Sequence, residues 1–149
     1  DRSSTALVQG QGTYIGRKNP KNRSGYGAMV YDLGFYYIGC WQENCRYGMG
    51  YMIDKNGNYY KGEWAKDEPH GYGEYFDFEN DYNWFYKGKW KNSNKEGLGI
   101  EQYHDGTEFR GYYRDGLRNG YGEYIFSENC YFKGNLTNDV VNGAGEQKG

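Results

Sequence analysis

Apolar and polar residues alternate along short segments of the chain, and glycine interrupts each segment at a fixed place. Tyr60, Gly62 and Trp64 alternate with the charged residues Lys61 and Glu63. Because successive side chains of a β-strand point to opposite faces, this pattern predicts a strand with both rings on one face. The opposite face also receives apolar residues, at Met49, Tyr51, Ile53, Tyr72, Phe76, Leu98 and Ile100. Both faces of the predicted sheet are therefore partly apolar, which favours a partner covering one of them.

The glycines recur in three series that share one register. The first series is Gly16, Gly39, Gly62, Gly88, Gly111 and Gly134, with steps of 23, 23, 26, 23 and 23 residues. In each unit a second glycine follows nine residues later, and a third glycine two residues after that. Two residues after the first glycine, four units carry a large ring, at Trp41, Trp64, Trp90 and Tyr113. This fixed register identifies an array of repeats.

Each unit is predicted to be a β-hairpin, and successive hairpins are predicted to pair into an elongated, twisted antiparallel meander of all-β class. Asn56-Gly57 and Asp105-Gly106 mark turns between units, because these dipeptides are the strongest short hairpin signals. The polar segments 65–70 and 114–119 are expected to be loops within units. The predicted organisation is an N-terminal cap or partial repeat over residues 1–13, followed by six repeats over residues 14–36, 37–59, 60–85, 86–108, 109–131 and 132–149.

The repeated glycines need an interaction that offsets their cost. Glycine in a strand is less favourable than alanine by about 0.5–1 kcal/mol. A buried aromatic ring removes roughly 150–250 Å² from water, which is worth at most about 4–6 kcal/mol. We therefore expect aromatic rings to stack over the hollows that the glycines leave.

Composition narrows the classes of protein. Hydrophobic residues make up only 36% of the 149 residues, so a thick globule with two packed layers is not expected. Aromatic residues at 20% argue against disorder, and the net charge of −2 argues against strong nucleic-acid binding. An odd set of three cysteines, Cys40, Cys45 and Cys130, is typical of a reduced intracellular chain.

Two segments are candidate binding sites. One is a basic cluster, which is either a solvated loop or a contact for an anionic lipid headgroup or acidic protein surface, formed by Arg17, Lys18, Lys21 and Arg23. The other is the three-residue expansion between Gly73 and Gly88. It is either a turn that folds back on its own sheet or an exposed partner anchor, and its rings are Tyr82, Trp84 and Phe85.

No constellation of residues predicts an enzyme, a metal site or a cofactor. His70 and His104 lie at predicted turns, and Cys40 and Cys45 lack the second pair that a zinc site needs. The Gly-x-Gly pairs lack the third glycine and the helix of a dinucleotide site. The segment from Asp54 to Ala65 lacks the glycine and glutamate of a calcium loop.

The segment Tyr60-Lys-Gly-Glu-Trp64, followed by His70-Gly-Tyr-Gly73, resembles the MORN (membrane occupation and recognition nexus) repeat. The resemblance extends over residues 14–149. The histidine of the family pattern is present only at His70, and Lys18 replaces the tryptophan in the first repeat. Such variation argues against a catalytic role for the histidine position.

The resemblance implies a non-enzymatic scaffold or protein-interaction module that organises a cytoskeletal, ciliary or membrane-associated assembly. Alternatives are a phosphoinositide-binding module and an accessory array of a larger enzyme. The expected location is intracellular, in the cytoplasm or cytoskeleton, or in a cilium or flagellum. The expected partner is a protein, either a helix or a second copy, that packs on the sheet against the rings of Trp41, Trp64, Trp90 and Tyr113.

Overall fold

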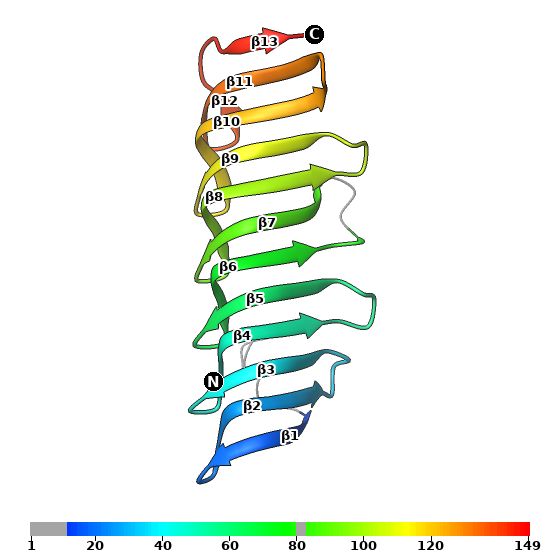
Figure 1. Ribbon diagram of the computed structural model, residues 1–149, viewed down its shortest axis with the longest axis vertical. Coiled ribbons are helices and arrows are strands. Elements are labelled where there is room, and N and C mark those ends of the chain that lie inside the picture. The colour runs from blue at the N-terminus through cyan, green and yellow to red at the C-terminus, as the bar shows by residue number, and fades with distance from the viewer. Residues whose placement is uncertain (1–11, 80–82) are drawn as a thin grey trace.

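The computed structural model describes residues 12–79 and 83–149, which form one antiparallel sheet and contain no helix (Figure 1). From β1 to β12 each strand pairs with the next one along the chain, and β13 (Glu146–Lys148) pairs with β11. The other strands are β1 (Gly12–Asn19), β2 (Asn22–Tyr31), β3 (Tyr36–Gln42), β4 (Cys45–Ile53), β5 (Tyr59–Ala65), β6 (Glu68–Phe76), β7 (Asn83–Lys91), β8 (Asn94–Tyr103), β9 (Glu108–Arg114), β10 (Leu117–Ser127), β11 (Cys130–Thr137) and β12 (Val140–Val141). The predicted all-β meander is confirmed. Of the predicted cap, residues 12 and 13 belong to β1, and residues 1–11 lie outside the described residues.

Two-residue turns close the hairpins within units. At Lys66 and Asp67 the φ angles are 49° and 69°, so both residues are left-handed, as a type I′ turn requires. The predicted loops 65–70 and 114–119 are therefore too long, because residues 68–70 already belong to β6 and residues 117–119 to β10. This turn type matches the right-handed twist of the flanking strands, so the strands continue to the turn.

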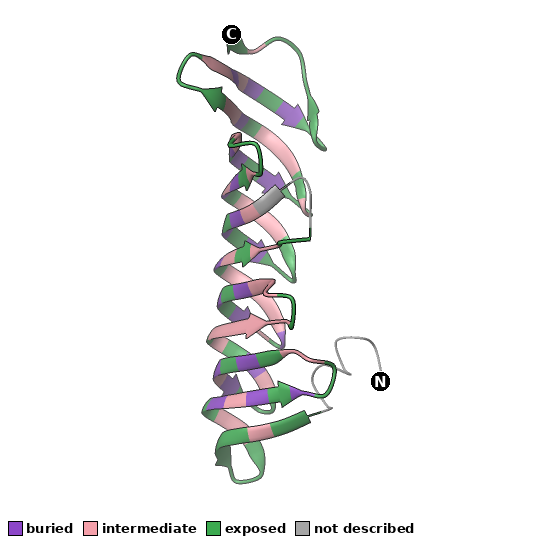
Figure 2. Ribbon diagram, turned by 90° about the vertical axis from the view of Figure 1, so that its right-hand side faces the viewer, coloured by how far each residue is buried: buried purple, intermediate pink, exposed green. Residues whose placement is uncertain are grey.

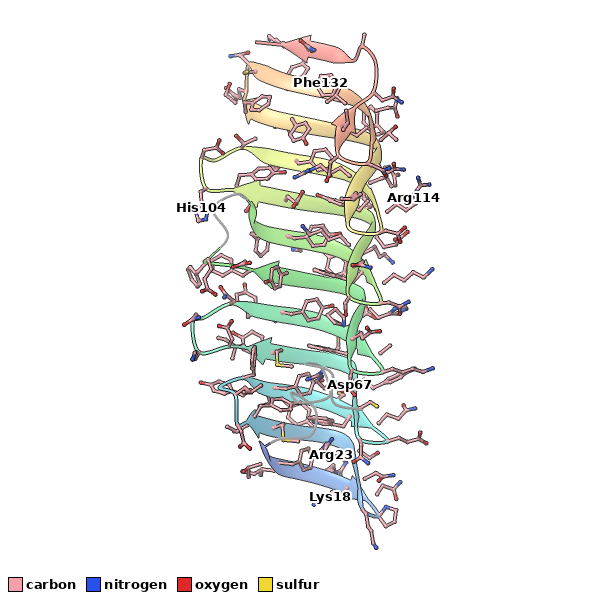
Figure 3. All side chains as sticks on the ribbon, turned by 180° about the vertical axis from the view of Figure 1, so that it is seen from behind. Lys18, Arg23, Asp67, His104, Arg114 and Phe132 are labelled. Carbon is pink, nitrogen blue, oxygen red and sulfur yellow. The ribbon has the colours of Figure 1, made fainter. Side chains whose placement is uncertain are left out.

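Longer connections between units lie at the opposite ends of the strands from the two-residue turns. Asp54 organises one of them, since its Oδ1 accepts hydrogen bonds from the backbone N–H groups of Asn56 (2.8 Å) and Asn58 (3.1 Å). The predicted turn at Asn56-Gly57 is confirmed, and only Gly57 has a positive φ (90°) there. Figure 3 shows the two sides formed by the strand ends, with His104 on the side of these connections and Lys18 and Arg114 on the side of the two-residue turns.

Two of the glycine series pair directly across the sheet and form what we call the glycine row. Gly27 pairs with Gly39, Gly50 with Gly62, and so on through Gly122 and Gly134. The remaining series lies at bulges in the second strand of each hairpin. Gly71 is an example, with a φ of 101° next to a register shift between Gly62 and Trp64.

The buried side chains lie on the face that carries the glycine row, which we call the inner face. They recur in strand after strand along the array (Figure 2), at Met29, Tyr31, Tyr37, Trp41, Tyr60, Trp64, Tyr86, Trp90, Phe109, Tyr113, Phe132 and Leu136. The predicted stacking of rings over glycines is confirmed. The Tyr86 ring covers Gly88 and Gly99, and a Cβ added to Gly88 would lie 2.7 Å from the Tyr86 hydroxyl oxygen. A single sheet thus builds a core without a second layer.

Candidate functional site

The rings of the inner face form a continuous stack, which we call the aromatic ladder. Trp64 lies between Tyr37 of the preceding hairpin and Tyr60 of its own hairpin, with ring centroids 5.3 and 5.1 Å apart and interplanar angles of 87° and 88°. These edge-to-face contacts are favoured by the ring quadrupoles. The same arrangement links all the rungs, in the order Tyr14, Trp41, Tyr37, Trp64, Tyr60, Trp90, Tyr86, Tyr113 and Phe109.

The polar atoms of the ladder bind the backbone. Trp64 Nε1 donates to the Gly50 carbonyl of the preceding hairpin at 3.1 Å, and the Tyr60 hydroxyl donates to the Glu63 carbonyl at 2.8 Å. Trp41 and Trp90 make the equivalent bond to the preceding hairpin. Burial, followed by the Glu63 carboxylate, raises the pKa of Tyr60, so this phenol remains a hydrogen-bond donor. Each ring therefore fixes both its own hairpin and the next.

A row of cations lies over the ladder, at a position just after the two-residue turns. The Arg46 guanidinium carbon is 4.9 Å from the Trp64 ring centroid, and Arg23 has the same distance to Trp41. Lys95 and Arg118 occupy the equivalent places over Tyr86 and Phe109. Sequence reasoning placed Arg23 in a basic cluster and missed the other three. Their spacing in the repeat register was the signal that could have found them.

Arg46 also joins two consecutive hairpins through a buried ion pair. Its Nε lies 3.3 Å from Asp67 Oδ1, and the two side chains are only 3% and 5% exposed. The Arg46 backbone N–H donates to the same oxygen at 2.8 Å, and Arg46 Nη2 donates to the Asp67 carbonyl at 3.0 Å. Arg118 and Asp139 repeat this contact in a more exposed form. We call this contact between a turn and the preceding hairpin the turn clasp.

Glu101 is a further buried charge on the inner face. Its carboxylate receives Lys95 Nζ at 2.8 Å, Arg118 Nη2 at 3.1 Å and the Tyr113 hydroxyl at 2.6 Å. Burial alone would raise the pKa of Glu101, but the two cations and these hydrogen bonds outweigh burial and lower it. The ion pairs cross strands β8, β9 and β10, so the cluster holds two hairpins together.

This lowered pKa predicts acid sensitivity. The ionised Glu101 stabilises the folded state above its ordinary pKa of 4.5, and the stabilisation is lost as pH falls through the lower pKa of the folded state. We therefore expect the Glu101→Gln variant to be less stable than the native chain at neutral pH and to differ from it less at acidic pH. Urea unfolding at both pH values measures this, because the other carboxylates cancel in the comparison. A difference that stays constant or grows toward acidic pH contradicts it.

The rings predicted to contact a partner are buried within the chain. Trp41, Trp64, Trp90 and Tyr113 are 3%, 5%, 9% and 3% exposed. The structure brings them together, as expected, but in the ladder, where each packs between rings of adjacent hairpins. Their use as a partner surface stays a prediction, and little of their area is open to a partner.

The other predicted binding residues are distributed differently. Tyr82 and the side chain of Trp84 lie outside the described residues. Phe85 is half-buried near Phe76, with ring centroids 6.4 Å apart, and lines a hollow with Trp90. In the basic cluster, three side chains are exposed around the β1–β2 turn, whereas Arg23 packs on the ladder and donates to the Asn44 carbonyl at 3.0 Å. Anion binding by Arg17, Lys18, Lys21 and Arg23 stays a prediction.

An open groove of about 1270 Å³ lies near the C-terminal hairpins. Its walls include Tyr124 and Phe126, whose rings stack at 6.3 Å, and Phe126 is 53% exposed. Phe132 also lines the groove, and Figure 3 shows its ring on the sheet near that end. The charged residues of the lining are the two cations Arg118 and Lys148 and the carboxylate of Asp105, so cations outnumber carboxylates there. The groove thus offers apolar, aromatic walls with cations beside them.

Two kinds of site were not found within residues 12–79 and 83–149. No group of three or more His, Cys, Asp or Glu side chains there is arranged to hold a metal ion. The same residues contain no helix with the length and apolarity needed to cross a membrane.

Comparison with known families identifies the repeat. The MORN repeat family model matches residues 60–77, 86–108 and 109–131, which include strands β6 and β8–β10 and most of β5 and β7. These segments are MORN repeats. A search of curated proteins gave no match to the chain. MORN repeats are generally modules for protein or membrane interaction, and the family is typically non-enzymatic. Within the matched segments, the aromatic residues from Tyr60 to Tyr113 belong to the ladder, and the paired glycines from Gly62 to Gly122 belong to the glycine row.

Proposed function

We propose that this chain is a non-enzymatic scaffold that binds protein partners within an intracellular cytoskeletal, ciliary or membrane-associated assembly. The observation that carries the proposal is the open aromatic groove beside a rigid ladder. The rings of the ladder pack between successive hairpins, and this packing holds the sheet in one shape along its length. The groove, in contrast, leaves half of the Phe126 side chain uncovered. Exposed aromatic residues in a preformed groove are typical anchors for a partner.

The groove also indicates which segment of a partner would fit. Tyr124, Phe126 and Phe132 offer apolar contacts, and Lys148 adds a cation to the lining. A partner segment with apolar residues beside carboxylates is complementary to this lining. The groove is preformed by β10, β11 and β13, so binding requires no large rearrangement of the sheet.

Affinity capture from the native cell tests the proposal. We expect the immobilised chain to retain cytoskeletal or membrane-linked proteins, and Phe126→Asp to lose them because a carboxylate replaces the groove's exposed ring. Tyr121→Asp is the matched control, since Tyr121 lies on the same strand, is 46% exposed and does not line the groove. Equal capture by both variants, or the absence of such proteins from the native sample, would rule out the groove as the docking site.

Binding of phosphoinositides or other anionic headgroups is the second candidate function. Its support is the exposure of Arg17, Lys18 and Lys21 around one hairpin turn. Two observations give lipid binding less support than the binding of a protein partner. Arg23 is held against Trp41, and the net charge of the chain is −2. Membrane attraction of this kind grows with the number of free cations, at about 1 kcal/mol for each.

A further inference from the structure

The outer face of the sheet, opposite the glycine row, differs in polarity between the N-terminal strands and the later strands. On strands β1–β4 it is apolar, with Ile15 73% exposed, Val30 53%, Tyr36 55% and Ile38 46%. Cross-strand pairing makes these residues neighbours, since Ala28 pairs with both Ile15 and Ile38, and Tyr36 pairs with Val30. Further exposed apolar side chains extend the area at Tyr26 and Met49. We call this area the outer patch.

Charged side chains appear on the outer face from β5 onward. The strand-to-strand row that holds Ile15, Ala28, Ile38 and Tyr51 continues with residues of alternating charge, at Lys61, Glu74 and Lys87, and later Arg110, Glu123 and Lys133. Within the outer patch, in contrast, Arg17 carries the only outward charge on β1–β4, and it lies at the margin. Part of one sheet face therefore lacks the charged residues that keep the rest of that face in water.

The outer patch has the size of a stable interface. Its six exposed apolar side chains present on the order of 700 Å² to solvent. The largest apolar patch of a typical monomer covers about 300–600 Å², and a standard interface buries about 800 Å² on each partner. The outer patch therefore exceeds what a monomer usually exposes and approaches what one side of a dimer buries.

The shape of the outer patch fits a second copy of itself. Ala28 forms a shallow site between the larger side chains Ile15 and Ile38. A two-fold axis between β2 and β3 places Ile38 of each copy over Ala28 of the other, as a self-complementary interface requires. The charge boundary at β5 sets the extent of contact, because overlap beyond β4 would bury Lys61 and Glu74.

We propose that two copies of this chain pack back to back through the outer faces of β1–β4, related by a two-fold axis near Ala28 and Ile38. The inference rests on the proposed function, since it names one partner of the scaffold. Such packing leaves both inner faces, and the groove on each, open to other proteins. The result is a two-sided scaffold with two copies of the groove.

Sedimentation velocity and light scattering of the full chain test this proposal. The expected mass is that of a dimer at micromolar concentration. Ile38→Glu is expected to weaken association by about 100-fold or more, because it places a charge at the axis. Leu98→Glu is the matched control, since Leu98 lies on the outer face of β8 beyond the patch, with 57% exposure, and should leave the dimer intact. A monomeric native chain, or a dimer that Ile38→Glu leaves unchanged, overturns the proposal.

Two further measurements keep the outcome interpretable. Circular dichroism checks that Ile38→Glu folds, and Ile38→Thr, which keeps a β-branched residue, replaces it if it does not. Capture through the groove is measured on the same samples. A monomeric native chain that still captures partners overturns the dimer but leaves the proposed function standing. A dimer that captures no partner overturns the proposed function but leaves the dimer standing.

Discussion

Replacing Gly73 with alanine should lower the free energy of unfolding by about 3 kcal/mol, although only one methyl group is added. Gly73 lies in the glycine row, and an added Cβ would overlap the Tyr60 hydroxyl and the ring carbon that carries it. The Tyr60 ring cannot move aside without losing its contacts with Trp64 and Trp90. Urea unfolding of the native chain and the variant measures the loss.

Two controls separate steric overlap from other effects of the added methyl group. Gly106→Ala meets no atom within 4 Å and should cost only about 1 kcal/mol, from its φ of 91°. In the presence of Tyr60→Ala, the Gly73→Ala change should cost much less, because the ring it displaces is gone. Equal losses for Gly73→Ala and Gly106→Ala would show that the ring does not rest on the glycine row as described.

The fold could be predicted from the sequence because glycine and ring positions share one register. Gly62 and Gly73 are paired across a hairpin, and Tyr60 precedes Gly62 by two positions, so periodicity alone places the ring over both. The turn at Lys66 and Asp67 was assigned too many residues. Neither residue is glycine, although both adopt left-handed φ, so the sequence carried no strong signal for a two-residue turn.

The candidate site was less predictable, for a physical reason. Alternation shows that both faces hold apolar residues, but not which face holds the core. The glycine row decides this, because only beside residues without side chains can a large ring such as that of Tyr60 lie directly on the sheet. The partners Arg46 and Asp67 are 21 residues apart and meet only because successive hairpins stack in phase. Nothing local to either residue indicates that pairing.

Removing the Asp67 carboxylate should destabilise the chain by about 3 kcal/mol, because Asp67→Ala leaves the Arg46 guanidinium buried without its counter-charge. Asp139→Ala is the matched control at the same point of a later turn clasp. Asp139 is 39% exposed and its partner Arg118 also pairs with Glu101, so we expect a loss of at most about 1 kcal/mol. Urea unfolding of the two variants measures the difference.

A second substitution separates the charge from the packing of the turn clasp. Arg46 also covers the Trp64 ring, so Arg46→Met keeps an apolar stem over the ladder while it removes the charge. Combined with Asp67→Ala, it should recover most of the lost stability, since neither buried charge remains. If the double variant is no more stable than Asp67→Ala, or if Asp139→Ala costs as much as Asp67→Ala, then an unpaired buried charge is not the cause.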